Sequence, residues 1–470
     1  MLNDFFLNKT IQNFPFELTS EQRIALERIV TFLFTPKQKS AFLLKGYAGT
    51  GKSSLIGALV KTMDEFRRKT VLLAPTGRAA KVFASYSNHP AYTIHKKIYR
   101  QKRSSADVEE FSTANNPHTD TLFIVDEASM ISNDKPDSFM FGTGRLLDDL
   151  IDYVYSGENC RLILMGDSAQ LPPVMQDSSP ALQEDVLQGY GITVFSETLS
   201  QIVRQAESSG ILYNATRIRQ TLASKETGKY PKLSISQFQD IRNISNADLV
   251  EEISTAYDRN GIENTIIISR SNKRANTYNQ GIRNTILYRE NELSNGDLLM
   301  ITKNNYFWTE NEERINFLAN GEILEVLRIR GTEKRYGFRF CNVLVRCIDH
   351  DIELEIKILL DALHSDSAGL TKERSQEFFY NILSEYNNTR TKADRMKQMR
   401  ENPHYNAVQV KFAYAITCHK AQGGEWQNVF LDLGYVPKDY LGESFYRWLY
   451  TAFTRARERL YLVNLPNDFL

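Results

Sequence analysis

Apolar and polar positions alternate in blocks along this chain, and most apolar blocks have the length of a buried strand. Four such runs lie in its first part: AFLLKG (41–46), TVLLAP (70–75), TLFIVDE (121–127) and CRLILMGD (160–167). Stretches with helical spacing separate them, and the first helix is predicted at 18–34 behind a Thr19-x-x-Gln22 capping box. Continuous apolar strands that alternate with helices indicate a parallel sheet covered on both faces.

A second group of apolar runs predicts another sheet of the same kind. These runs are NTIIIS (264–269), VKFAYAIT (410–417), NVFLDL (428–433) and RLYLV (459–463). After the first of them, the pattern changes to alternating apolar and polar residues with hairpin-like spacing, over about 291–360. We therefore expect a small antiparallel β domain inserted there, followed by a charged and helical excursion at about 367–403.

Composition sets the limits of this picture. The 470 residues are too many for one hydrophobic core, so two or more domains are expected. The 57 basic and 57 acidic residues cancel, so any nucleic-acid partner must be argued from local features. Four cysteines without CxxC spacing argue against a zinc site or a disulfide framework and fit a reducing cytoplasm. Neither a signal-peptide pattern nor an apolar run of membrane-spanning length is evident, so we expect a cytoplasmic protein.

The stretch GYAGTGKS, Gly46 to Ser53, matches the phosphate-binding pattern G-x-x-x-x-G-K-[ST] between a predicted strand and a predicted helix. Its glycines let backbone N–H groups turn towards phosphates, and the helix N-terminus adds a positive end. Lys52 would reach the β- and γ-phosphates of ATP, and Ser53 would hold Mg²⁺. The residues that we expect to hold the nucleotide here are Gly46, Gly49, Thr50, Gly51, Lys52, Ser53 and Ser54.

Two later strand ends carry polar groups suited to ATP hydrolysis. Asp126 and Glu127 close a buried strand, where Asp126 would bind Mg²⁺ and Glu127 would deprotonate the attacking water. In MGDSAQLPPV (165–174), Gln170 could donate to a γ-phosphate oxygen and accept from the water. Out of this context, both segments would be ordinary turns.

An arginine near the C-terminus lies beside an apolar stripe. The stripe, at helical spacing, consists of Trp448, Leu449, Ala452, Phe453 and Ala456. Arg455 falls at its rim, where a guanidinium is costly to desolvate unless an anion meets it. The pattern therefore predicts an anionic partner for Arg455; the alternative is a surface arginine that pairs with Glu458.

Taken in order, these segments resemble the motifs of superfamily 1 DNA helicases, in particular the RecD-like and Dda-like branch. The matching segments are LTSEQ, GYAGTGKSS, APTGRAAK (74–81), TIHKKI (93–98), DEAS, GDSAQLPPV, LSQIVRQ (199–205), TCHKAQGGEW (417–426) and YTAFTRARERL. They follow the family's order over nearly the whole chain. Cys418 departs from the small apolar or β-branched residue that the family often has at this position.

The resemblance implies an α/β fold with two tandem RecA-like parallel-sheet P-loop domains, an inserted SH3-like β domain and a short pin insertion. The implied boundaries are 1–245 for the first domain with its pin at about 97–119, 246–290 and 404–470 for the second, and 291–403 for the insertion.

The resemblance also implies roles for several side chains. Arg455 would be an arginine finger that meets the γ-phosphate, worth roughly 10³–10⁵ in rate, and Arg204 a second one. Gln22 would read the adenine edge, unless it is only the capping-box partner, and Glu425 would contact the ribose.

A nucleic-acid track is implied across both domains. Its expected members are Thr76, Arg78, Lys81, Thr93, His95, Thr417, His419 and Gln422. Sequence-independent binding of a single strand needs such phosphate donors together with flat groups for the bases. Near the locally basic HKKIYRQKR (95–103), Tyr99 and Phe111 are candidates for base contacts at the pin.

The sequence thus predicts an ATP- and Mg²⁺-dependent DNA helicase that translocates along single-stranded DNA. Its expected partners are single strands and their junctions with duplex, and we expect an active monomer. The 5′→3′ direction is carried over from the family alone. An RNA helicase of the same superfamily, and a nucleotide-switched nucleic-acid-binding ATPase that unwinds nothing, remain alternatives.

Overall fold

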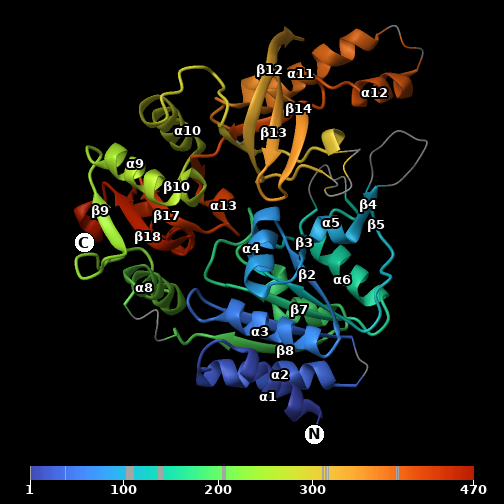
Figure 1. The fold of residues 1–470 in the computed structure, drawn as a ribbon, viewed down its shortest axis with the longest axis vertical. Coiled ribbons are helices and arrows are strands. Elements are labelled where there is room, and N and C mark those ends of the chain that lie inside the picture. Colours follow the sequence, from blue (N-terminus) through green and yellow to red (C-terminus); the bar gives the residue numbers. More distant parts are fainter. Residues whose placement is uncertain are drawn as a thin grey trace.

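The first half of the chain forms a six-stranded parallel sheet (Figure 1). A computed structural model describes residues 2–470 except 37–38, 102–110, 136–140, 204–207, 310–311, 313–314, 316, 368, 388 and 390. The strand order is β3-β2-β6-β7-β1-β8. The strands are β1 (Ser40–Gly46), β2 (Lys69–Ala74), β3 (Ala91–Thr93), β6 (Thr121–Val125), β7 (Arg161–Gly166) and β8 (Thr193–Leu199). The four apolar runs predicted here are all strands of this sheet.

Helices cover both faces of this first sheet, as its continuous apolar strands require. They are α1 (Leu2–Asn13), α2 (Ser20–Phe34), α3 (Lys52–Glu65), α4 (Gly77–Ser87), α5 (Ile94–Ile98), α6 (Leu146–Ser156) and α7 (Glu184–Gly189). Leu26 of α2 and Leu59 of α3 belong to the core on one face, whereas Leu150 of α6 belongs to the core on the other. The predicted capping box at Thr19 and Gln22 is present at the start of α2.

A second parallel sheet has the order β16-β10-β17-β18-β9. Its strands are β9 (Ile241–Ile244), β10 (Thr265–Ser269), β16 (Ala415–Thr417), β17 (Trp426–Asp432) and β18 (Ala456–Val463). The helices in its part of the chain are α8 (Gly210–Ser224), α9 (Leu249–Asn260), α10 (Asn272–Gly281), α13 (Cys418–Ala421) and α14 (Glu443–Phe453).

The second sheet begins earlier in the chain than the expected boundary at residue 245. β9 pairs in parallel with β18, and α8 shares a core with α14. β9 is an edge strand whose two middle residues, Arg242 and Asn243, are exposed, so it lacks the continuous apolar run that marks the other strands.

The expected strand at 410–417 is in fact two strands that belong to different sheets. β15 (Val408–Phe412) closes a barrel, and only β16 joins the second parallel sheet. Asn279 of α10 stabilises the break between β15 and β16, because its side-chain oxygen accepts hydrogen bonds from the backbone N–H of Tyr414 (3.0 Å) and Ala415 (2.8 Å). Apolar periodicity could not reveal this break, since both halves are buried.

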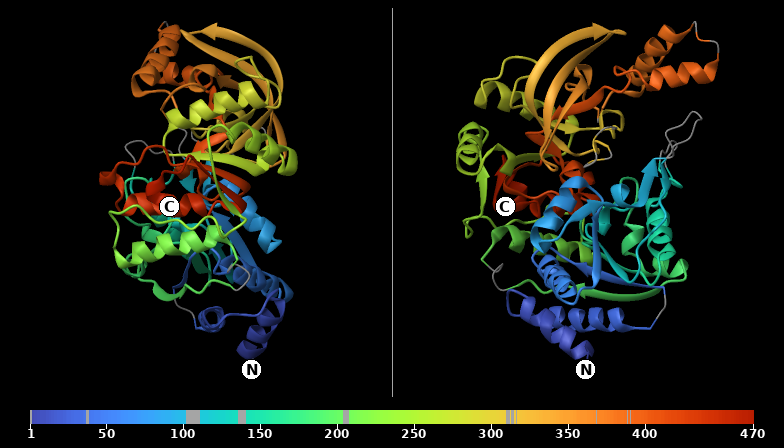
Figure 2. Two further views of the ribbon diagram at one scale, coloured as in Figure 1. Left: turned by 90° about the vertical axis from the view of Figure 1, so that its left-hand side faces the viewer. Right: turned by 45° about the vertical axis from the view of Figure 1, so that its right-hand side comes forward.

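The inserted region is a closed five-stranded barrel with a helical extension. Its strands are β11 (Leu298–Ile301), β12 (Ile323–Arg335), β13 (Phe338–Cys347), β14 (Ile352–Leu359) and β15, and the extension carries α11 (Lys372–Leu383) and α12 (Lys392–Arg400). Figure 2 shows the barrel and these helices at the end of the molecule opposite the N-terminus. A short antiparallel pair, β4 (Tyr99–Gln101) and β5 (Phe111–Thr113), lies at the expected pin.

The helices described here include none with the length and hydrophobicity needed to cross a bilayer.

Candidate active site

The phosphate-binding loop joins the end of β1 to the start of α3. Gly49 and Gly51 have φ values of +75° and +77°, a region that side chains other than glycine rarely adopt. The Lys52 ammonium folds back over the loop and donates to the carbonyl oxygens of Gly46 (2.6 Å) and Tyr47 (3.0 Å). A Cβ on Gly46 would lie 2.8 Å from the Lys52 side chain, so glycine is needed there for this approach.

A cavity of about 420 Å³ opens beside this loop. Its lining includes Phe14, Phe16, Gln22, Ser54 and Val203. The Gln22 amide is fully buried: its oxygen accepts from the Thr19 N–H, and its nitrogen donates to the Thr50 carbonyl. Gln22 therefore joins the capping box to the phosphate loop. Phe14 and Phe16 were not predicted to line this cavity, although the aromatic segment NFPF stands directly before the first motif.

The acidic pair follows β6 and is enclosed. Burial raises the pKa of Asp126, whose carboxylate accepts from the Tyr86 hydroxyl (2.7 Å) and from the Glu127 N–H (2.7 Å). Burial also raises the pKa of Glu127 to about 7, and the nearby Arg455 opposes that rise. Tyr86 of α4 was not predicted to reach this site, because nothing in its sequence position points towards Asp126.

Arg455 reaches this acidic pair from the second sheet. It lies in the turn between α14 and β18, just after the helix on which it was placed, and is 2% exposed. Its guanidinium donates to the carbonyls of Thr451 (3.1 Å) and Gly424 (3.2 Å), and one nitrogen lies 3.9 Å from a Glu127 carboxylate oxygen. The anion that Arg455 meets in this structure is therefore Glu127, and a surface pair with Glu458 is excluded by its burial.

The loop after β7 is hydrogen-bonded to α14, which packs on the second sheet. Tyr450 accepts a hydrogen bond from the phosphate-loop N–H of Ala48 (3.0 Å) and donates to Asp167 (2.6 Å). The Leu171 N–H donates to Thr451 (2.8 Å). Gln170 is 7% exposed, and its side-chain oxygen has no hydrogen-bond partner in the described part of the chain. The loop thus links the phosphate site of one sheet to a helix of the other.

Three expected site residues have other surroundings than predicted. Gln422 donates to the Leu171 carbonyl (2.7 Å), so its amide faces the loop after β7 instead of an open track. Arg78 stacks on Trp426, with its guanidinium carbon 3.8 Å from the ring centroid, and burial lowers its pKa to about 10. Glu425 forms an ion pair with Arg457 (2.6 Å). Arg204 lies outside the described residues.

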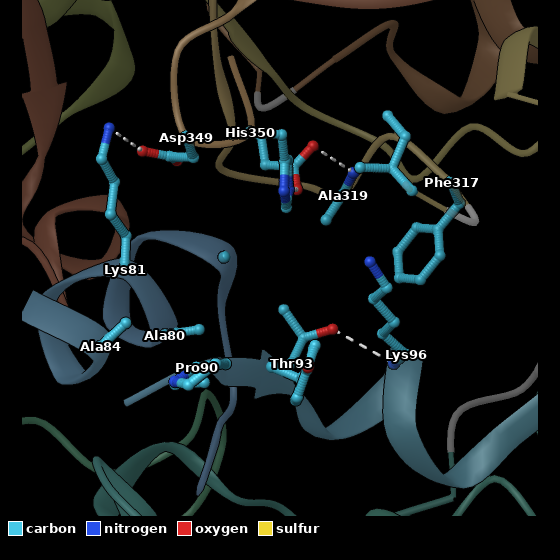
Figure 3. A pocket seen from close by; sticks show the side chains of 15 residues that line it. Ala80, Lys81, Ala84, Pro90, Thr93, Lys96, Phe317, Ala319, Asp349 and His350 are labelled. Carbon is cyan, nitrogen blue, oxygen red and sulfur yellow. Dashed lines mark hydrogen bonds and ion pairs between the residues drawn. The ribbon is translucent and has the colours of Figure 1, made fainter. Parts of the chain in front are cut away.

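A groove of about 260 Å³ runs between the first sheet and the barrel (Figure 3). It is lined by residues that include Lys81, Thr93, Lys96, Phe317 and His350. The Thr93 hydroxyl accepts from the Lys96 N–H (3.1 Å) and so caps α5. Lys81 donates to the Ile348 carbonyl of the barrel (3.0 Å). This groove gathers part of the predicted nucleic-acid track.

The remaining members of the predicted track discussed here are Thr76, beside the first sheet, and Thr417 and His419, beside the second. Thr76 caps α4 by accepting from the Ala79 N–H (3.2 Å). A Cβ on Gly423 would lie 3.2 Å from the Thr76 hydroxyl, so the two sheets meet closely there. Thr417 ends β16, and the following His419 is exposed.

The pin residues do not offer open ring faces, contrary to expectation. Tyr99 is 2% and Phe111 7% exposed, and both pack against Phe141, with ring centroids 4.9 and 4.8 Å away. The Tyr99 hydroxyl also donates to Asp149 (2.7 Å). His95 joins the same cluster, and burial lowers its pKa to about 4, so its ring is neutral at pH 7. These three side chains build the base of the pin.

Comparison with known families identifies two matching segments. The model described as an AAA domain matches residues 17–232, and the UvrD-like helicase C-terminal domain matches 412–463. Among relatives, the chain is 24% identical over 522 residues to the uncharacterized protein R530 of Acanthamoeba polyphaga mimivirus, covering 94% of this chain and 98% of that protein. It is 24% identical over 438 residues to the ATP-dependent RecD2 DNA helicase of Deinococcus radiodurans, covering 89% of this chain and 46% of RecD2. The chain thus spans less than half of RecD2.

Among solved structures, a Pif1 helicase from Bacteroides in complex with ADP-AlF3 and single-stranded DNA aligns over 97% of this chain and 94% of its own, with a TM-score of 0.47 and 15% identity.

The two sheets, the phosphate loop and the cross-sheet arginine define a P-loop NTPase with two motor domains. The AAA-domain match and the UvrD-like helicase C-terminal match support an ATP-hydrolysing helicase that is similar to the RecD-like branch of superfamily 1.

Proposed function

We propose that this protein is a DNA helicase that moves 5′→3′ along single-stranded DNA as a monomer, driven by hydrolysis of ATP·Mg²⁺. One observation carries the ATP-driven part of the proposal: Arg455 of the second sheet lies 3.9 Å from Glu127 of the first. Residues expected to act in hydrolysis thus come from both motor domains, so that a change at the nucleotide would alter contacts in both. The direction rests on the RecD-like resemblance.

The residues at the nucleotide site fit ATP and Mg²⁺. The phosphates would lie on the loop N–H groups and Lys52, and the base would occupy the cavity between Phe14, Phe16 and Gln22. The Ser53 hydroxyl and the buried Asp126 carboxylate supply the oxygen ligands that Mg²⁺ prefers. When bound, Mg²⁺ neutralises charge on the β- and γ-phosphates.

Glu127 is suited to take the proton of the attacking water. Its pKa of about 7 lies near the working pH, where a general base is most effective. Arg455 would leave Glu127 for the γ-phosphate, and Gln170, whose side-chain oxygen is unpartnered among the described residues, would orient the water.

Movement would follow from opening and closing of the cleft between the sheets. α14 contacts both the phosphate loop and the loop after β7 through Tyr450, so the state of the nucleotide reaches the second sheet directly. The first sheet would grip the strand through Thr93 and Lys81, and the second through Thr417 and His419. If the two grips tighten alternately, each ATP moves the strand by one step.

The test uses two fluorescently labelled duplexes, one with a 5′ and one with a 3′ single-stranded tail, mixed with the protein and ATP·Mg²⁺. We expect strand release from the 5′-tailed duplex alone, and none with Glu127→Gln. Release from the 3′-tailed duplex alone would keep the motor and refute the direction. Stimulation of hydrolysis by RNA strands but not DNA strands would favour the RNA helicase, and release from neither duplex would favour the nucleotide-switched ATPase.

A further inference from the structure

A second groove, of about 340 Å³, lies on the barrel beside its helical extension. The loop that contains Lys303 and Phe307, helix α11 and the segment around Tyr405 form its walls. Phe307, Phe379 and Tyr405 line this groove and are each half-buried, so these residues keep part of their surface exposed. Aromatic surface that stays open in a groove is available for stacking.

The charge of this groove is positive. Lys303 and Arg400 line it, and none of its described lining residues is a carboxylate. Within the described chain, no ion pair engages either of these two cations. Elsewhere on the barrel, by contrast, arginines such as Arg346 are paired with glutamates. Unpaired cations among aromatic rings are the combination that binds single-stranded nucleic acid without sequence preference.

The position of the groove relates it to the pin. Tyr306 lines it, and its ring packs against Phe111 at the pin base (4.9 Å) and against Phe317 (5.0 Å). Phe317 in turn lines the groove between the first sheet and the barrel (Figure 3). The two grooves share no lining residue and meet at this aromatic pair. The packed rings of Tyr306 and Phe317 therefore separate the two grooves.

We propose that the barrel groove holds the DNA strand displaced at the fork, while the translocating strand occupies the groove of Figure 3. This inference rests on the proposed helicase function. Bases of the displaced strand would stack on Phe307, Phe379 and Tyr405, and Lys303 and Arg400 would meet its phosphates. Holding the displaced strand on the far side of the packed rings hinders it from pairing again with its complement.

The test compares two probes by fluorescence anisotropy at one fixed salt concentration: a 5′-tailed duplex, and the same duplex with an added, unpaired 3′ oligothymidine arm. We expect the arm to tighten binding by roughly tenfold, the order of one or two stacked bases. Phe379→Ala and Arg400→Ala should each remove most of this gain. The control on the same extension, Lys372→Ala, should retain it, because Lys372 is exposed and does not line the groove.

If the arm adds no affinity, or if the groove variants keep its gain while the protein stays folded by its melting temperature, the inference is overturned. Single-stranded DNA should still stimulate ATP hydrolysis in every variant; loss of stimulation in the native chain would instead overturn the proposed function. A second measurement does not depend on variants: a photoreactive thymidine analogue in the arm should cross-link to peptides around Phe307, Phe379 or Tyr405, and cross-links confined to other regions would refute the site.

Discussion

At the scale of single residues, the pair of Glu127 and Arg455 sets the chemistry. Burial raises the pKa of Glu127 to about 7 and Arg455 opposes it, so the carboxylate changes charge near neutral pH. A base must be ionised to act, and ATP turnover should therefore rise about tenfold from pH 6 to pH 8. A folded-state pKa above the unfolded value also means that the stability contributed by Glu127 is present below about pH 4.5 and is lost as the pH rises through 7. The pH profile of DNA-stimulated hydrolysis measures the expected rise in ATP turnover, and a flat profile would exclude Glu127 as the titrating base.

Removing Arg455 should slow hydrolysis without abolishing nucleotide binding. We expect Arg455→Ala to lower kcat by roughly 10³–10⁵, the range for an arginine finger. Arg457→Ala is the matched control, because Arg457 lies two residues away and pairs with Glu425 at the surface. Single-turnover hydrolysis measures the chemical step, and binding of a fluorescent nucleotide measures affinity. A loss in kcat of less than tenfold would speak against Arg455 as an arginine finger.

Tyr86 should position Asp126 for Mg²⁺. Hydrogen bonds to a ligating carboxylate typically contribute 10- to 100-fold in metal affinity, so we expect Tyr86→Phe to raise the Mg²⁺ concentration needed for half-maximal ATPase by about that factor. Nucleotide binding in EDTA should be unchanged. Tyr155→Phe, which removes a hydroxyl bonded to the Ser40 carbonyl, is the control and should leave the Mg²⁺ requirement unaltered.

At the scale of elements, the joint between β15 and β16 ties the barrel to the second sheet. Asn279 is 2% exposed and makes four hydrogen bonds to the backbone at this break. Asn279→Ala would leave buried backbone groups without partners and should cost about 3 kcal/mol or more of unfolding free energy. Urea denaturation measures this, with the exposed Thr277→Ala on the same helix expected to stay within about 0.5 kcal/mol of the native chain.

At the scale of the whole molecule, the stack of Arg78 on Trp426 lies between the two motor domains. If nucleotide closes the cleft, the surroundings of this indole must change. We expect a non-hydrolysable ATP analogue to alter tryptophan emission, and Trp426→Phe to remove most of that response although Trp308 and Trp448 remain. An equal response in the variant would place the motion elsewhere.

The sequence alone predicts the local chemistry of the candidate site. Gly46–Ser53, Asp126 with Glu127, and the four apolar strands around them could be predicted because a phosphate loop and a buried parallel strand are each specified by neighbouring residues. The order of the motifs likewise indicated a superfamily 1 helicase. For Arg455 the sequence required an anion, because burial of a guanidinium demands one, but it could not say which.

The folded structure supplies every contact between residues that lie far apart in the chain. It placed Glu127 opposite Arg455, Tyr86 on Asp126 and Tyr450 across the cleft, because each contact is made by folding and leaves no local pattern. It also enclosed Tyr99 and Phe111 in the pin base, and split 410–417 between barrel and sheet. All of these contacts escaped prediction for one reason. A hydrophobic pattern indicates that a residue is buried, whereas only the packing of the folded chain determines which partner it is buried against.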